Sequence, residues 1–107
     1  MNKQSILESI GAAYDHATEK HPFFATQAMQ LVEPETARHE LNRRRELLKY
    51  AEEMNSLDGS HVLECELAEA IEAYSEGRAN DCIAELWQCA AVLIRMVEMT
   101  EKESQNK

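Results

Sequence analysis

The segment ECELAEAIEAYSEGRANDCIAELWQ, residues 64–88, carries the strongest folding signal in the chain. Its apolar residues recur every three or four positions, which is the period of a helix with one apolar face. Gly77 can end such a helix, and Asn80 can cap the one that follows. The segment therefore predicts two long helices joined by a tight connection, which places them antiparallel.

Helical signals continue on the N-terminal side of this segment. Helix starts are expected at Ser5, Pro34 and Ser60, where the serines act as N-caps and Pro34 takes the first helical position. The residue before Pro22 is pushed out of helical geometry, so the first helix should end there, and a short helix is expected near 26–31. Core positions are expected at Ile6, Ile10, Tyr14, Phe23, Phe24, Leu41, Leu48, Ala51, Met54, Leu63, Leu67, Ala70, Ile71, Tyr74 and Trp87.

Length and composition favour one all-α domain. The chain has 107 residues, three glycines and two prolines, and it is rich in residues that favour helices. We expect a single domain over residues 1–107, folded as an antiparallel bundle of four to five helices. Residues 1–34 would form an N-terminal helical segment, and the polar residues 100–107 are expected to fray.

The charge and the cysteines exclude several classes of protein. A net charge of −9 argues against binding a nucleic-acid polymer through basic patches. The three cysteines are odd in number and lack a C-x-x-C motif, which favours a reducing cytoplasm over a disulfide framework. No secretory signal is visible, and no apolar run approaches the ~20 residues that span a membrane.

The last helix is predicted to be apolar on two sides. Its wide face would carry Ile83, Leu86, Trp87, Ala90, Leu93, Ile94 and Val97, while Cys89, Val92 and Met96 lie opposite. A helix that is apolar nearly all round is usually buried on both sides. Because a chain this short has few helices to cover both, we expect a homodimer or larger assembly, with Cys89, Val92 and Met96 at the interface.

Four polar side chains could meet between the two long helices. Glu66 and Glu69 are three residues apart, so their carboxylates are neighbours on one helix, and Glu85 and Gln88 have the same spacing on the next. Antiparallel packing can bring the two pairs opposite one another. Crowded carboxylates repel, and Mg²⁺, which takes oxygen ligands, relieves that repulsion. The alternative is a solvated face, since glutamate is a strong helix former.

The two segments LECELAEAIEAYSEG and IAELWQCAAVLIRMVE resemble a known family. They are similar to the MazG-like branch of the all-α nucleoside triphosphate pyrophosphohydrolases, whose pattern is E-x-x-E followed, after a turn of variable length, by E-x-x-D. Glu66 and Glu69 match the first half. Glu85 matches the start of the second half, and Gln88 stands where the family has aspartate. The resemblance covers residues 63–97, and residues 1–34 carry no family signal.

The resemblance implies a Mg²⁺-dependent hydrolase that works as a homodimer or homotetramer, and Mn²⁺ can replace Mg²⁺. Such enzymes cleave a nucleoside triphosphate between its α and β phosphates, giving a nucleoside monophosphate and pyrophosphate. If the matching positions have the same roles as in the family, the resemblance implies that Glu66, Glu69 and Glu85 are both catalytic and metal-binding. Gln88 would be a further metal ligand, although its amide brings no charge and cannot act as a base.

Basic residues supply candidates for phosphate contacts. Arg44 and Lys49 precede the motif, and Arg95 lies two turns beyond Gln88. Each has a plainer interpretation: a solvated face for Arg44 and Lys49, and for Arg95 a surface cation near other acidic residues. Two further functions stay open. One is a catalytically weak module that binds nucleotides or oligomerises on the same scaffold, and the other is a helical structural protein whose glutamates lie in bulk water.

Overall fold

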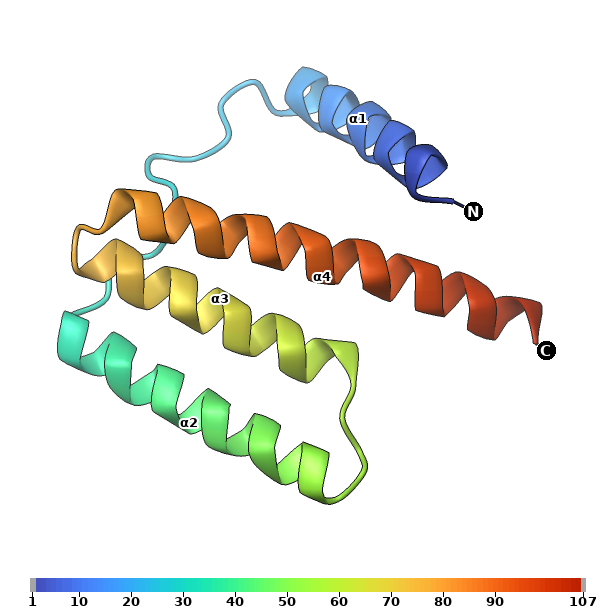
Figure 1. Ribbon diagram of the computed structural model, residues 1–107. Helices are drawn as coiled ribbons and strands as arrows, with labels where there is room; N and C mark the ends of the chain where they lie inside the picture. Colours follow the sequence, from blue (N-terminus) through green and yellow to red (C-terminus); the bar gives the residue numbers. More distant parts are fainter. Residues whose placement is uncertain (1, 107) are drawn as a thin grey trace.

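The computed structural model describes residues 2–106 and contains four helices over that range. They are α1 (Lys3–Lys20), α2 (Pro34–Glu53), α3 (Gly59–Ser75) and α4 (Ala79–Gln105). Figure 1 shows α2, α3 and α4 side by side in one layer, with α3 in the middle and each helix antiparallel to the next. The all-α class and the antiparallel pair are confirmed.

Small side chains let the three helices approach closely. The fully buried residues of α3 are Cys65, Ala68, Ala70 and Ala73, so small side chains lie at the centre of both helix contacts, and the larger Tyr74 packs beside them. Leu41 and Leu48 of α2 pack on one side, and Cys82 of α4 packs on the other. Many large hydrophobic side chains remain exposed on the single chain.

Several helix boundaries differ from the expected ones. Pro34 is the first residue of α2 and Gly77 ends α3 with a positive φ of 72°, as expected. Asn2 and Asp58, rather than the two serines, cap α1 and α3, because their side chains accept the free backbone N–H three residues on. Asn80 is no cap, since α4 already starts at Ala79.

One segment was predicted with the wrong secondary structure, because residues 26–31 form no helix. At the other end of the chain, α4 continues to Gln105 and so includes most of the polar segment that was expected to fray. Pro22 and Pro34 disfavour helix at the residue directly before each of them, which agrees with the end of α1 at Lys20 and the start of α2 at Pro34. Within residues 2–106, no helix is both long and apolar enough to cross a bilayer.

The two apolar sides of α4 exchange the roles expected for them. Cys89 is buried, and Val92 and Met96 are partly buried; Met96 reaches Gly59 of α3, where an added Cβ would lie 2.7 Å from its Cγ. The prediction that these three residues form the outer interface is therefore wrong. Their narrower side chains fit against the small residues of α3, and the wide face that carries Trp87, which is 70% exposed, is left uncovered.

The N-terminal part was expected to contribute more to the core than it does. In Figure 1, α1 lies outside the three-helix layer and is joined to it by residues 21–33. Ile6 is fully buried, whereas Tyr14 is exposed. Phe23 and Phe24 are 74% and 89% exposed, so their assignment to the core of the single chain is wrong.

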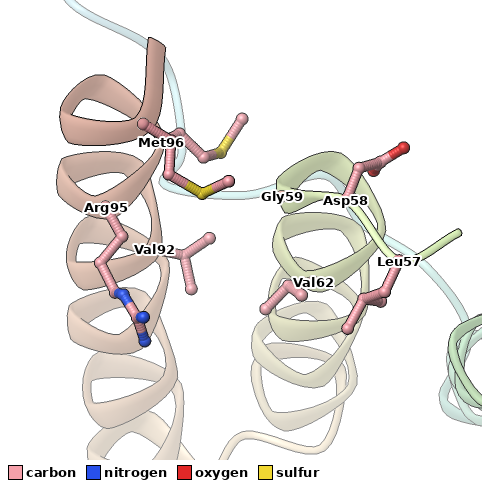
Figure 2. Close-up of a pocket in the computed structure, with 8 residues that line it drawn as sticks. Leu57, Asp58, Gly59, Val62, Val92, Arg95 and Met96 are labelled. Carbon is pink, nitrogen blue, oxygen red and sulfur yellow. The ribbon is translucent and has the colours of Figure 1, made fainter. Parts of the chain in front are cut away.

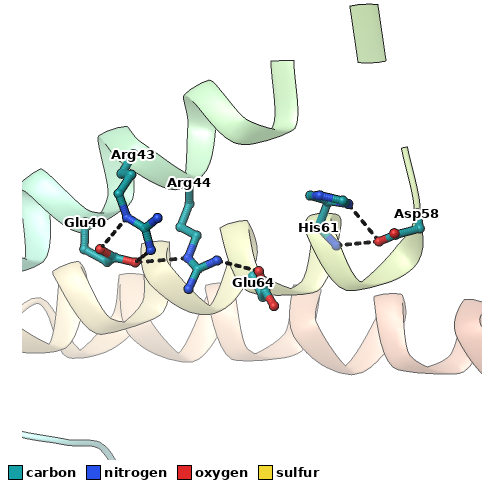
Figure 3. Close-up of polar contacts among 6 residues, drawn as sticks. All are labelled: Glu40, Arg43, Arg44, Asp58, His61 and Glu64. Atoms are coloured by element: carbon teal, nitrogen blue, oxygen red, sulfur yellow. Dashed lines mark hydrogen bonds and ion pairs between the residues drawn. The ribbon is translucent and has the colours of Figure 1, made fainter. Parts of the chain in front are cut away.

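The cap of α3 should make stability depend on pH. Asp58 Oδ1 accepts the His61 backbone N–H at 3.0 Å and contacts His61 Nδ1 at 2.9 Å (Figure 3). The backbone hydrogen bond from His61 is the main cause that lowers the pKa of Asp58 below its usual value. Because the folded state favours the charged carboxylate, this stabilisation is present above the ordinary aspartate pKa and is lost as pH falls through the lowered value.

We expect Asp58→Asn to remove this pH dependence while keeping an acceptor at the N-cap. Urea unfolding at about pH 5 and about pH 2.5, where histidine stays charged, would measure it. At the higher pH, wild type should have a larger free energy of unfolding than Asp58→Asn. At the lower pH, this difference between the two proteins should disappear. Asp15→Asn, at an exposed site on α1, is the control. A gap that is the same at both pH values would contradict this account of the cap.

Candidate metal centre

Antiparallel packing of α3 and α4 brings three glutamates together. Glu66 and Glu69 come from α3 and Glu85 from α4, and each offers a carboxylate oxygen that lies within 4.8 Å of the other two. All three side chains are partly buried. The spacing that suggested these residues therefore corresponds to a real juxtaposition. Gln88, the fourth position of the motif, is exposed one turn beyond Glu85.

The cluster is electrostatically strained by its own charges. The pKa of Glu69 is raised, first by burial and then by a hydrogen bond and like charge from Glu85, while Arg45 acts in the opposite direction. Burial, followed by the charge of the same glutamates, raises the thiol pKa values of Cys65 and Cys89 on either side. The groups that converge closely enough to share a metal ion are the three carboxylates.

The donor set fits a hard divalent cation such as Mg²⁺. Mg²⁺ binds oxygens at about 2.0–2.1 Å, so two ligands on opposite sides of one ion lie about 4 Å apart. Oxygens already within 4.8 Å of one another reach such an arrangement through small side-chain rotations. A dication would also favour the charged form of Glu69, whose pKa is raised first by burial and then by the hydrogen bond and like charge from Glu85.

A hollow of about 350 Å³ adjoins two of these carboxylates. Its lining residues are Arg45, Glu69, Glu72, Ala73, Arg78, Asp81, Ala84 and Glu85. Glu72, three residues beyond Glu69 on α3, lines the same hollow and pairs with Arg78 at 3.2 Å. Arg78 also bonds Asp81 at 2.8 Å, so acidic neighbours on both helices hold it in place.

Arg45 is the residue that the sequence analysis missed. Its Nη2 lies 3.5 Å from Glu69 Oε1, and its side chain is 55% exposed. A signal for it was present, because Leu41, Arg45 and Leu48 are spaced as one stripe on the face of α2 that meets α3. A cation in an otherwise apolar stripe indicates a specific partner on the next helix.

The three basic candidates named from sequence lie elsewhere. Arg44 donates to Glu40 at 3.0 Å and pairs with Glu64, so it ties α2 to α3 (Figure 3). Lys49 is exposed on α2. Arg95 lines a separate pocket described next. None of the three lines the hollow beside the carboxylates, so their assignment as phosphate contacts gains no support.

A second pocket, of about 290 Å³, lies further along α3 and α4 and is mainly apolar. Figure 2 shows Val62 and Val92 facing one another across it, with Met96 above and Arg95 at the edge. Seven residues separate Glu69 from Val62 and also Glu85 from Val92, which is two helical turns, or about 10 Å. Two turns return to nearly the same side of a helix, so the pocket and the carboxylates share one side of the α3–α4 pair.

Comparison of the chain with protein-family models, with curated proteins and with solved structures found no match. Any functional assignment therefore depends on the geometry of the cluster and on the resemblance of its motif.

Proposed function

We propose that this chain is a Mg²⁺-dependent nucleoside triphosphate pyrophosphohydrolase. The observation that carries the proposal is the convergence of Glu66, Glu69 and Glu85, from two helices, to within 4.8 Å of one another. Their position beside a hollow whose wall carries two arginines and four carboxylates adds a place for phosphates once Mg²⁺ offsets the acidic charge. The resemblance to MazG-like enzymes supplies the reaction type.

The glutamates would hold the cation, and Mn²⁺ can take its place. When bound, the metal neutralises phosphate charge and lowers the pKa of a coordinated water. Glu66, Glu69 and Glu85 fix where this happens, because each is held on a packed helix and partly shielded from solvent. One carboxylate can also accept a hydrogen bond from the attacking water and so orient it.

In the proposed reaction a water oxygen forms a bond to the α-phosphorus. The bond between that phosphorus and the bridging oxygen to the β-phosphorus breaks, and pyrophosphate leaves with the electron pair. A carboxylate of the cluster takes the proton that the water loses and passes it to solvent. The products are a nucleoside monophosphate and pyrophosphate, and no oxidant or reductant is required.

The apolar pocket beyond the carboxylates offers space for the nucleoside. Phosphates at Glu69 and Glu85 would place the sugar beside Gln88 and the base toward Val62 and Val92, two turns away. Such a pocket discriminates bases by shape more than by hydrogen bonding. Gln88, whose amide both donates and accepts, suits contact with a sugar hydroxyl as well as with a metal.

We further propose that the enzyme is a cytoplasmic homodimer or homotetramer. The wide face of α4, with Ile83, Trp87, Leu93 and Val97 all exposed on the single chain, is the surface that a second copy would cover. Cys65, Cys82 and Cys89 are free and buried, which suits a reducing compartment.

A nucleotide assay tests the proposal. With Mg²⁺ and a mixture of ribo- and deoxyribonucleoside triphosphates, wild type should release pyrophosphate and nucleoside monophosphate. Glu85→Gln should lower the rate by about a hundredfold or more, because loss of even an indirect metal contact typically costs ~10–100-fold. Glu98→Gln, the same change at an exposed site on α4, should leave the rate unchanged. Release of orthophosphate and a nucleoside diphosphate instead, or equal rates in both variants, would contradict the proposal.

The neutral amide at Gln88 favours one alternative, a catalytically weak module that binds nucleotides on the same scaffold. Gln88 leaves three formal negative charges where the family pattern has four. The same assay separates the two functions, since the module would bind a triphosphate with Mg²⁺ but release no pyrophosphate.

A further inference from the structure

We propose that Arg45 is a mobile counter-ion that pairs with Glu69 in the resting protein and moves to the β- and γ-phosphates of the substrate when Glu69 takes the metal. This inference rests on the proposed function and assigns a positioning role to a residue outside the glutamate motif. It makes the hollow beside the cluster the site that holds the leaving pyrophosphate.

The first reason is the looseness of the Arg45 contact. Its guanidinium lies 3.5 Å from Glu69 Oε1, beyond the 2.7–2.9 Å typical of a strong charged hydrogen bond. The other arginines nearby are bonded more closely: Arg43 to Glu40 at 2.9 Å and Arg78 to Asp81 at 2.8 Å. Two arginines line the hollow, and Arg45 therefore loses less interaction energy than Arg78 when it leaves its present partner.

The second reason is where Arg45 is anchored. Its backbone belongs to the face of α2 that packs on α3 through Leu41 and Leu48, so the base of the side chain is fixed. Its side chain is 55% exposed, so the guanidinium end has room to swing. The hollow of about 350 Å³ lies within its reach, because Arg45 already forms part of the wall.

The third reason is electrostatic. A dication held by Glu66, Glu69 and Glu85 repels the guanidinium and removes most of the attraction that Glu69 exerts on it. A phosphate in the hollow restores an anionic partner, and a guanidinium can bind two of its oxygens at once. Arg78 already has three acidic partners, so it serves as part of the wall and has less charge to offer a phosphate.

This exchange has a signature that a purely structural residue would not give. Without phosphate, Arg45 competes with Mg²⁺ for Glu69, so Arg45→Gln should bind Mg²⁺ several-fold more tightly than wild type. With Mg²⁺ saturating, the same variant should bind pyrophosphate about tenfold or more weakly, which is the usual cost of losing a charged hydrogen bond. Arg45→Lys keeps the charge but lacks the planar guanidinium that can bind two oxygens. Its affinities for Mg²⁺ and for pyrophosphate should lie between those of wild type and Arg45→Gln.

Titration calorimetry with Mg²⁺ alone, and then with pyrophosphate at saturating Mg²⁺, tests the proposal on the full chain. Arg43→Gln, on the same helix but bonded to Glu40, is the matched control and should follow wild type in both titrations. Weaker binding of both ligands to Arg45→Gln would show a structural role and overturn the inference, as would unchanged binding of pyrophosphate. If wild type fails to bind Mg²⁺, the proposed function and this inference both fall, whereas normal Mg²⁺ binding with no effect of Arg45→Gln removes this inference alone.

Discussion

Mg²⁺ at a hundred times its Kd should raise the free energy of unfolding by about 2.7 kcal/mol, because an ion that binds only the folded state stabilises it by mass action. For a chain of this size that corresponds to a rise in Tm on the order of 10 °C. The physical source is the cluster of Glu66, Glu69 and Glu85, whose oxygens lie within 4.8 Å of one another. Thermal melts followed by circular dichroism, with and without Mg²⁺, would measure the shift.

Glu69→Gln should remove most of this Mg²⁺-dependent gain. The variant loses a charged ligand, and it also relieves the repulsion from Glu85, so its melting temperature without metal should not fall below that of wild type by much. Glu98→Gln should keep the full response to Mg²⁺. Glu72→Gln is a poor control, because Glu72 lines the same hollow and pairs with Arg78. Identical responses in wild type and Glu69→Gln would leave the glutamates as a solvated face.

Sedimentation at micromolar concentration should show a species at least twice the 12.2 kDa chain mass. The reason is the wide face of α4, where a tryptophan that is 70% exposed lies among several other exposed apolar residues. Tryptophan is enriched among the few residues that dominate an interface, and truncating such a residue weakens association by about 2 kcal/mol or more. Trp87→Glu should therefore weaken self-association by roughly thirtyfold or more.

Tyr50→Glu is the matched control for this change, since Tyr50 is 62% exposed but lies on α2, away from that face. It should sediment as wild type does. A wild-type protein that stays at the mass of one chain would contradict the assignment of the wide face as an interface between copies.

The sequence predicted most reliably what helical periodicity controls. The break at Gly77 and the three-residue spacing in each half of the motif placed Glu66, Glu69 and Glu85 together, because two antiparallel helices with a tight connection have little freedom of register. Pro34 at the start of α2 followed from its fixed backbone geometry. These features depend on local geometry, which a single sequence records directly.

Features that depend on competition between neighbours were predicted poorly. Asp58 and Ser60 are both good caps, and only the course of the loop decides which one is used. Likewise, both sides of α4 are apolar, and the choice between them depends on the small side chains of α3, which admit Cys89 and Met96 more easily than Trp87. Arg45 was missed because the stripe of Leu41, Arg45 and Leu48 does not show which residue of the neighbouring helix Arg45 meets, and that residue is Glu69.

The most direct test of the metal centre is a crystal structure of the protein with Mg²⁺ and a triphosphate whose α,β bridge is an imido group that resists hydrolysis. We expect Mg²⁺ bound by oxygens of Glu66, Glu69 and Glu85 and by the α-phosphate, with the terminal phosphates in the hollow lined by Arg45. A metal bound elsewhere, or a triphosphate in place while the three glutamates point into bulk solvent, would contradict it.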